Sequence, residues 1–447
     1  MGILKLIEQA GIVGCGGAGF PTHKKLTRGM EYFIVNGAEC EPLLWTDRWL
    51  MKNKAPELVR AVCALKKELR FSHCVFAVKA HYEEEIAALR KAIADAGADI
   101  TVHELESFYP AGDEQTIVYE VTGRVVPPAG LPGAVGAIIN NVATVYAISE
   151  AMDGIPFTHK YLTVTGEVNT PTVLRVPLGT SYQDCIRWAG GAKLSRYFCI
   201  SGGPMMGKPV PMEEAETAVV TKTTSGILVL SEDSYHARTY GVNLSRMLNR
   251  ARAACIQCTF CTQLCPRHML GHPIEPHRIM RAMATGLPLE EILRDPAIRN
   301  AQLCCECGVC EVYACPMGLF PRKINGMLKN ALGAAGVRYQ AEEQDWTPHP
   351  LREERKAPSE KVAARAGVAP YYDLEIRTLR EETPAQVEVP LKMHIGVPAV
   401  PTVASGDFVK VGDLIAKPPE KAMGASIHAS LDGRVERVGE RIVIVKE

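Results

Sequence analysis

Nine of the fifteen cysteines in this 447-residue chain fall within 61 residues, between Cys255 and Cys315. No apolar run elsewhere reaches the ~18 residues that a membrane span needs. The first fourteen residues contain Glu8 and no long apolar core, so no signal peptide is predicted. We therefore expect an intracellular, reducing compartment, where closely packed cysteines serve as metal ligands more often than as disulfides.

The cysteines form two runs, each closed by Cys-Pro. Cys255-x2-Cys258-x2-Cys261-x3-Cys265-Pro266 has the spacing of [4Fe–4S] loops, in which the fourth cysteine binds the other cluster. Cys304-x2-Cys307-x2-Cys310-x4-Cys315-Pro316 has one extra residue and a spare neighbour, Cys305, whose own spacing fits no usual cluster loop. Crossing the fourth ligands predicts one cluster on Cys255, Cys258, Cys261 and Cys315, and a second on Cys265, Cys304, Cys307 and Cys310.

Four thiolates also suit zinc, although zinc ribbons favour separated Cys-x2-Cys pairs over a contiguous run. Between the two runs, apolar residues at steps of three and four predict short helices over residues 274–285 and 288–293, and another follows at 321–332. This arrangement resembles the helical di-cluster ferredoxin module of respiratory and anaerobic enzymes. The resemblance implies a one-electron relay.

The overall composition narrows the class of protein. Fifty Lys and Arg balance fifty Asp and Glu, and the zero net charge argues against a nucleic-acid partner. With 47% hydrophobic and 22% charged residues the chain is ordinarily globular, and its length suggests about three domains.

A glycine-rich segment, GCGGAGF at residues 14–20, lies near the N-terminus. Glycines let backbone N–H groups approach a phosphate closely, but the segment lacks the strand and helix that flank a standard dinucleotide loop, so a flexible surface loop remains an alternative. A buried strand is predicted at residues 32–36. A strand, helix and strand at residues 71–80, 83–96 and 100–104 predict a parallel α/β sheet.

Four motifs then make a resemblance specific: GCGGAGFPTHKK (14–25), NGAECEP (36–42), YPAGDE (109–114) and NNVAT (140–144). In this order they resemble the flavin domain shared by the complex I flavoprotein subunit and the Rnf complex C subunit. The resemblance implies an FMN phosphate and ribityl chain held by the glycine loop and its lysine, a flavin contacted by asparagines, and acidic residues near NADH. The residues implied are Gly14, Gly16, Gly17, Gly19 and Lys25 for the first role, Asn36, Asn140 and Asn141 for the second, and Glu39, Glu41, Gly112 and Glu114 around the nucleotide.

These cofactors form a chemically consistent set. NADH gives up a hydride, which carries two electrons, whereas iron–sulfur clusters accept one electron at a time, and FMN can do both. The cofactors carry the chemistry, so no catalytic side chain is predicted.

The sequence predicts a multidomain α/β protein. We expect a flavin- and NADH-binding α/β domain over residues 1–155, a β-grasp module resembling soluble-ligand-binding (SLBB) inserts over 156–203, and a return to the flavin domain over 204–240 through a strand at 226–230. A helical ferredoxin domain over 241–340, a charged linker over 341–385 and an all-β barrel-sandwich hybrid over 386–447 follow. The last resembles biotinyl and lipoyl carriers, but Ala422-Met-Gly-Ala425 occupies the tip where a carrier has its modified lysine.

This domain order resembles the corrinoid (cobalamin) reductases of propanediol-utilization microcompartments. The resemblance implies NADH-dependent reduction of cob(III)alamin and cob(II)alamin towards cob(I)alamin, for coenzyme B12 recycling. It also implies a corrinoid adenosyltransferase and shell proteins as partners, and a cytoplasmic location inside the microcompartment. Three alternatives remain: an Rnf-type electron-transfer subunit, a non-catalytic iron–sulfur adaptor, and a ligand-binding module with structural cysteines.

Overall fold

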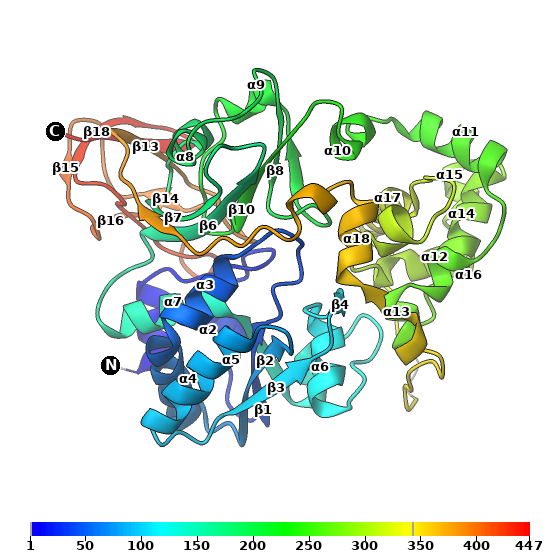
Figure 1. Cartoon of the computed structure of the whole chain (residues 1–447), viewed down its shortest axis with the longest axis horizontal. Helices are drawn as coiled ribbons and strands as arrows, with labels where there is room; N and C mark the ends of the chain where they lie inside the picture. The colour runs from blue at the N-terminus through cyan, green and yellow to red at the C-terminus, as the bar shows by residue number, and fades with distance from the viewer. Residues whose placement is uncertain (1, 342–343) are drawn as a thin grey trace.

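A parallel four-stranded sheet organises the N-terminal third of the chain, as the computed structural model shows for residues 2–341 and 344–447 (Figure 1). The strand order is β3-β2-β1-β5. The bounds are Tyr32–Gly37 for β1, His73–Lys79 for β2, Thr101–Leu105 for β3 and Ala137–Asn141 for β5. The predicted strand–helix–strand unit is confirmed, with α5 (Glu83–Asp95) as its helix.

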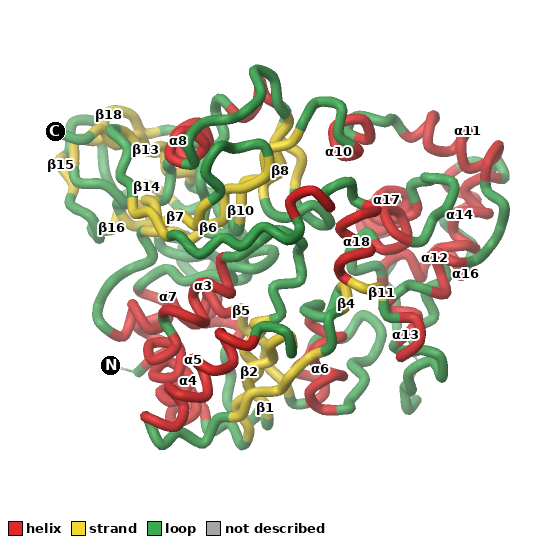
Figure 2. The backbone as a smooth tube through the Cα atoms, in the orientation of Figure 1, coloured by secondary structure: helices red, strands yellow, loops and turns green. Residues whose placement is uncertain are grey.

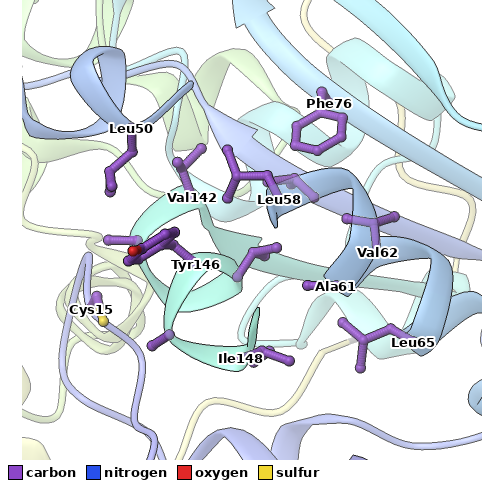
Figure 3. Close-up of a cluster of buried hydrophobic side chains, with 14 of the residues drawn as sticks. Cys15, Leu50, Leu58, Ala61, Val62, Leu65, Phe76, Val142, Tyr146 and Ile148 are labelled. Atoms are coloured by element: carbon purple, nitrogen blue, oxygen red, sulfur yellow. The ribbon is translucent and has the colours of Figure 1, made fainter. Parts of the chain in front are cut away.

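Helices cover both faces of this sheet, as the strongly apolar strands require. On one face α4 (Ala55–Leu69) places Leu58, Val62 and Leu65 at helical spacing against α7 (Val142–Met152), and Figure 3 shows this cluster with Phe76 of β2. On the other face α6 (Glu114–Thr122) packs Ile117 and Val118 against residues of the strands. The sheet is therefore held rigidly between two apolar layers.

A second, six-stranded sheet follows, in the order β12-β7-β6-β10-β8-β9. Its central strand β10 (Gly226–Leu230) runs parallel to β6 (His159–Gly166) and antiparallel to β8 (Phe198–Ser201). The expected return of this strand to the flavin domain is therefore not observed. All five residues of β10 are buried, and such a short apolar run fits any buried strand, so the sequence could not show which sheet receives it. The same sheet contains β7 (Thr172–Pro177) and β9 (Lys208–Val210), and α8 (Tyr182–Trp188) follows β7 in the chain.

The segment of residues 344–385, called the strap below, is packed rather than solvated. Its short strand β11 (Ala357–Pro358) pairs with β4 (Phe108–Tyr109), and β12 (Leu379–Glu381) extends the second sheet beside β7. Between them α18 (Ser359–Arg365) buries Val362 and Ala363. The prediction of a charged linker is wrong for these residues. The sequence suggested a solvated segment because its buried apolar side chains are few among many charged ones. Glu342 and Glu343, which belong to the same prediction, lie outside the described residues. Figure 1 shows the strap crossing the molecule.

The cysteine-rich segment forms a separate helical module (Figure 2). Its longer helices are α11 (Leu244–Ala254), α14 (Pro276–Ala284) and α17 (Pro321–Ala334), with the short α15 (Leu289–Ile292) between the last two. They enclose a small apolar core that also contains Cys265 and Cys315. The predicted helices are confirmed. Within residues 2–341 and 344–447, every helix is too short or too polar to cross a membrane.

The C-terminal residues form two small antiparallel sheets, ordered β13-β19-β18-β15 and β14-β16-β17. Their strands are β13 (Gln386–Pro390), β14 (Val400–Pro401), β15 (Phe408–Val409), β16 (Leu414–Lys417), β17 (Ile427–His428), β18 (Gly433–Val438) and β19 (Arg441–Val445). The fully buried Lys222 attaches this unit to the N-terminal domain, because its Nζ donates to the carbonyls of Gly11 and Ser426, each at 2.7 Å. Burial lowers the pKa of Lys222 to about 7.

Candidate functional site

A cavity of about 250 Å³ lies at the carboxyl ends of the parallel strands β1 and β5, where ligands of open α/β sheets bind. All four sequence motifs contribute to its wall, although Gly16 of the first and Asn141 of the last lie 125 residues apart in the sequence. The predicted residues that line it are Gly16, Asn36, Glu39, Glu41, Gly112, Glu114 and Asn141. The geometry thus brings these seven together, and their contact with a flavin stays a prediction.

Five other predicted residues lie around the cavity without lining it. Gly14 donates its N–H to the carbonyl of Phe20 at 2.9 Å, and Gly19, with φ +74°, packs its backbone against Thr223 and His394. Gly17 lies in open space beside Gly16. Gly14 and Gly19 therefore shape the loop, and Gly16 is the one predicted glycine of the loop that lines the cavity.

Lys25 and Asn140 are placed differently from the glycines. Lys25 Nζ lies 2.5 Å from Glu114 Oε1, so the lysine after the glycine loop is ion-paired with a residue of the cavity wall. Asn140 is buried, and its Nδ2 has no hydrogen-bond partner among the described residues. An unpaired buried donor is costly, so this amide suits a group that the chain itself does not supply.

The glycine loop is tied to the start of α7. Cys15 N donates to Thr144 Oγ1 at 2.9 Å, and Asn141 caps the helix by accepting from Ala143 N at 2.9 Å. Helix N-termini and glycine-rich backbone both favour phosphate groups. This cradle therefore fits the phosphate of FMN, and Gly16, Gly17 and the start of α7 would hold it.

Buried carboxyl groups form the opposite wall. Burial raises the pKa of Glu41 to about 7, and its carboxylate accepts the N–H groups of Met205 and Met206, each at 2.8 Å. Burial also raises the pKa of Asp47 to about 6, while the hydrogen bond from Asn141 Nδ2 at 2.5 Å works against this shift. Burial and the nearby Asp47 raise the pKa of Glu39. Burial therefore moves the pKa of all three carboxyl groups upward.

Several lining residues were missed by sequence reasoning. Asp47 lies on α3 (Thr46–Asn53), and Lys160 lies on β6 of the second sheet, outside every motif. Cys40 lies inside NGAECEP, and its Sγ accepts from Gly112 N at 2.6 Å. Asn36 Nδ2 holds the same residue by donating to Gly112 O at 2.8 Å. Only the position of Cys40 within a motif could have indicated its role.

The second cysteine loop reaches the same cavity. Cys307 lines it, and Tyr109 Oη donates to the backbone carbonyl of Cys307 at 2.7 Å. Beside this contact, Asp113 and Arg267 form an ion pair of 2.8 Å between side chains that are 12% and 11% exposed. The motif YPAGDE therefore connects the flavin domain directly to the cysteine-rich module.

The two cysteine loops have matching backbone conformations. Positive φ angles occur at Gln257 (55°) and Glu306 (58°), and again at Thr259 (65°) and Gly308 (83°). Each pair holds the same position when Cys255 is aligned with Cys304. The match supports the reading frame that starts at Cys304 and leaves Cys305 at a position equivalent to Ile256.

The extra residue of the second run has a structural explanation. Its counterpart in the first run is the α-helical turn α12 (Phe260–Gln263), whereas residues Val309–Tyr313 form a π-helix. A π-helical turn contains one more residue than an α-helical turn and occurs often at functional sites. The longer spacing from Cys310 to Cys315 is accommodated without moving Cys315 away from the first loop.

The arrangement of the cysteines is consistent with the crossed pattern. Cys255, Cys258, Cys261 and Cys315, the distal group below, line one cavity of about 30 Å³. The other four, Cys265, Cys304, Cys307 and Cys310, are called the proximal group below. Burial and the nearby thiols of Cys304 and Cys265 raise the pKa of Cys310. Four cysteines fit an iron–sulfur cluster, in which each thiolate binds its own iron. Across the described residues, no three His, Cys, Asp or Glu side chains are grouped to hold a single metal ion. The ligand assignment itself stays a prediction.

Two neighbouring glycines allow a test of the phosphate cradle. A Cβ on Gly16 would lie 2.9 Å from Asn141 Cγ, whereas a Cβ on Gly17 would meet nothing within 4 Å. We expect Gly16→Ala to destabilise the flavin-free protein by about 1–3 kcal/mol through overpacking, and Gly17→Ala to stay within about 0.5 kcal/mol. If the loop holds a phosphate, Gly17→Ala still weakens FMN binding, measured by fluorescence titration. Unchanged affinity would remove Gly17 from the site.

Comparisons with known families agree with this architecture. The sequence matches the Nuo51 FMN-binding domain over residues 7–150, the SLBB domain over 161–209, the 4Fe-4S dicluster domain over 254–320, and the RnfC barrel sandwich hybrid domain over 372–447. The predicted fold class is confirmed by these matches.

Individual relatives cover different shares of the chain. The Na(+)-translocating and proton-translocating ferredoxin:NAD(+) oxidoreductase subunits C of Acetobacterium woodii and Clostridium ljungdahlii are both 35% identical over 60% of this chain, and over 58% and 56% of their own lengths. Cobalamin reductase PduS of Salmonella typhimurium is 38% identical over 99% of this chain and 96% of its own length, and that of Citrobacter freundii is 37% identical over the same shares. With FMN-binding and 4Fe-4S dicluster domains and this full-length similarity, the chain belongs to the cobalamin reductase PduS family of electron-transfer oxidoreductases.

Proposed function

We propose that the chain uses NADH to reduce a corrinoid, from cob(III)alamin through cob(II)alamin towards cob(I)alamin. We call the cavity lined by Glu41 and Asn141 the flavin cavity. The observation that supports the proposal most strongly is that the second cysteine loop forms part of its wall, where Tyr109 Oη donates to the carbonyl of Cys307. A bound FMN supplies the conversion of a two-electron hydride into single electrons. The corrinoid as acceptor is supported by similarity to cobalamin reductases along nearly the whole chain.

The residues around the cavity have separate roles in this proposal. Gly16, Gly17 and the start of α7 bind the flavin phosphate, and Asn36, Asn140 and Asn141 orient the flavin. Glu39, Glu41 and Glu114 border the space for the nicotinamide nucleotide. Met206 also lines the cavity, on a loop whose N–H groups at Met205 and Met206 bind the Glu41 carboxylate.

The position of the cysteine groups supports an order for the relay. The proximal group includes Cys307 and therefore borders the flavin cavity. The cavity of the distal group is also lined by exposed apolar side chains, with Ile256 61% and Met317 38% exposed. Electrons would thus enter through the proximal group and leave at the distal group, where an acceptor can approach.

An anaerobic assay with two acceptors tests the proposal. Purified protein with FMN and NADH should reduce both hydroxocobalamin and ferricyanide, the first followed by its visible spectrum. Reduction of ferricyanide alone would refute the corrinoid as acceptor. If the protein were a non-catalytic adaptor, it would show cluster absorption without releasable flavin and would oxidise no NADH.

We also propose a role in coenzyme B12 recycling for propanediol degradation, inside a bacterial microcompartment and beside a corrinoid adenosyltransferase. Similarity to the propanediol-utilization reductases supports this setting. In a coupled assay with NADH, ATP, hydroxocobalamin and a purified adenosyltransferase, we expect adenosylcobalamin to form. Its absence, with cob(II)alamin accumulating, would show that the chain stops at the first reduction step.

A further inference from the structure

A second cavity of about 250 Å³ lies on the far side of the loop of residues 39–45 from the flavin cavity. Glu39, Cys40, Glu41 and Leu44 border both cavities, so this loop is a thin wall between them. The other walls come from α3, the end of β2 and the strap. The second cavity plays no part in the function proposed above.

Lys79, at the end of β2, is the first unusual feature of this cavity. The residue is 3% exposed, yet its Nζ makes one long hydrogen bond of 3.4 Å to the Glu39 carbonyl and otherwise lies 5.8 Å from the centre of the Tyr82 ring. No carboxylate within the described residues lies in ion-pair distance of it. An ammonium carries three donors, and a buried charge without a partner is costly. Lys79 therefore has unused donors at the cavity wall.

Arg48 presents a second cation, held in a fixed orientation. Its guanidinium lies 3.8 Å from the centre of the Trp45 ring and 4.2 Å from that of Tyr82. Its Nε donates to Glu85 Oε1 at 2.7 Å, while the two terminal nitrogens have no hydrogen-bond acceptor among the described residues. Stacking on two rings and one hydrogen bond pre-orient the remaining N–H fork, which is the geometry that binds an oxyanion with two parallel bonds.

The strap contributes a third donor. Ser359, at the start of α18, is 3% exposed, and its Oγ has no hydrogen-bond partner within residues 2–341 and 344–447. Tyr372 of the strap borders the same cavity. Three underused donors from three separate segments thus border one cavity.

Four acidic residues also border the cavity, and none of them neutralises these donors directly. The Glu41 carboxylate is bound by the N–H groups of Met205 and Met206. Burial beside Asp47 raises the pKa of Glu39, which favours its neutral form. Asp373 and Glu375 are exposed, and Glu375 pairs with Arg377 at 2.8 Å. Within the described part of the chain, the terminal nitrogens of Arg48, the Nζ of Lys79 and the Oγ of Ser359 are therefore left without a carboxylate acceptor, while burial lowers the pKa of Lys79.

We propose that this cavity binds a phosphate-type oxyanion between Lys79, Arg48 and Ser359, either as inorganic phosphate or as the phosphate group of a nucleotide. The aromatic side chains Trp45 and Tyr372 border the same space and would face the rest of a larger ligand. Because the site shares the NGAECEP wall with the flavin cavity, its occupant would contact the loop that carries Glu39 and Glu41.

Calorimetric titration of the flavin-loaded protein, without NADH or corrinoid, tests the site with inorganic phosphate and, separately, with ADP. We expect saturable binding at one site, beyond that seen with chloride. Tighter binding of ADP would identify a nucleotide site, and equal binding an inorganic phosphate site. No saturable heat with either probe would overturn the proposal.

Three variants locate the binding. Arg48→Lys keeps the charge but loses the fork, and should weaken binding by about tenfold or more. Lys79→Met removes the buried charge and should abolish binding, while flavin content reports whether the fold is intact. Lys52→Met, on the same helix but paired with Glu84 outside the cavity, is the matched control and should bind normally. If Arg48→Lys binds phosphate or ADP as well as the control does, the assignment of the oxyanion site to this cavity fails. This outcome decides the question even where Lys79→Met does not fold. Failure of NADH oxidation would not affect this result.

Discussion

Replacing Cys307 with alanine should stop corrinoid reduction while NADH still reduces the bound flavin. Cys307 belongs to the proximal group and borders the flavin cavity, so its loss breaks the relay at the first transfer. The iron content should fall by about four atoms per chain, because a cube needs all four thiolates. Iron and sulfide analysis, flavin bleaching by NADH, and hydroxocobalamin reduction measure the three effects separately. Persistent corrinoid reduction would show that electrons bypass the cysteines.

Two further substitutions test the order of the two cysteine groups and the choice of Cys304 as a ligand. Cys258→Ala removes a ligand of the distal group, so NADH should still reduce the proximal cluster, seen by electron paramagnetic resonance, but the corrinoid should stay oxidised. Cys305→Ala should keep the full iron content and activity, because the matching φ angles of the two loops place Cys304 in the ligand frame. Loss of iron in Cys305→Ala would reverse that assignment.

The sequence predicts which motifs meet at the cavity better than it predicts all the residues that line it. NGAECEP and NNVAT follow parallel strands, and the carboxyl ends of such strands meet at one edge, so Asn36 and Asn141 could be expected together. The cysteine frame stays a prediction from local spacing, which the matching φ angles of the two loops support. Asp47 and Lys160 were not, because they come from an amphipathic helix and from a strand of another sheet, with no motif to connect them.

Longer-range placement was the least predictable part of the fold. The run Gly226–Leu230 is apolar throughout, and only tertiary pairing decides that it completes the second sheet. The strap looks solvated because its buried residues, such as Ala357 and Val362, are few among charged neighbours. Its contribution of Ser359 to a cavity wall depends on that packing and leaves no periodic signal in the sequence.

Replacing Arg267 with methionine should loosen the cysteine-rich module from the flavin domain. The pair of Arg267 and Asp113 is almost wholly buried, at 11% and 12% exposure, and links the two parts beside the flavin cavity. Removing one partner of a buried pair leaves the other charge uncompensated and costs about 3–5 kcal/mol. In denaturant, cluster absorption should be lost at a lower concentration than in the unsubstituted protein, and ahead of the far-ultraviolet circular dichroism signal.

A second substitution separates the charge from the packing. Asp113 also caps α6 by accepting from Thr116 N at 3.1 Å, and asparagine caps helices about as well as aspartate. The double variant Arg267→Met/Asp113→Asn therefore removes both charges and keeps the cap, so it should be more stable than Arg267→Met alone. Lys91→Met, which breaks an exposed pair with Asp95, is the control and should shift stability by about 0.5 kcal/mol or less. If the double variant is no more stable than Arg267→Met, the uncompensated charge of Asp113 is not the cause, and lost packing of the arginine side chain accounts for the effect.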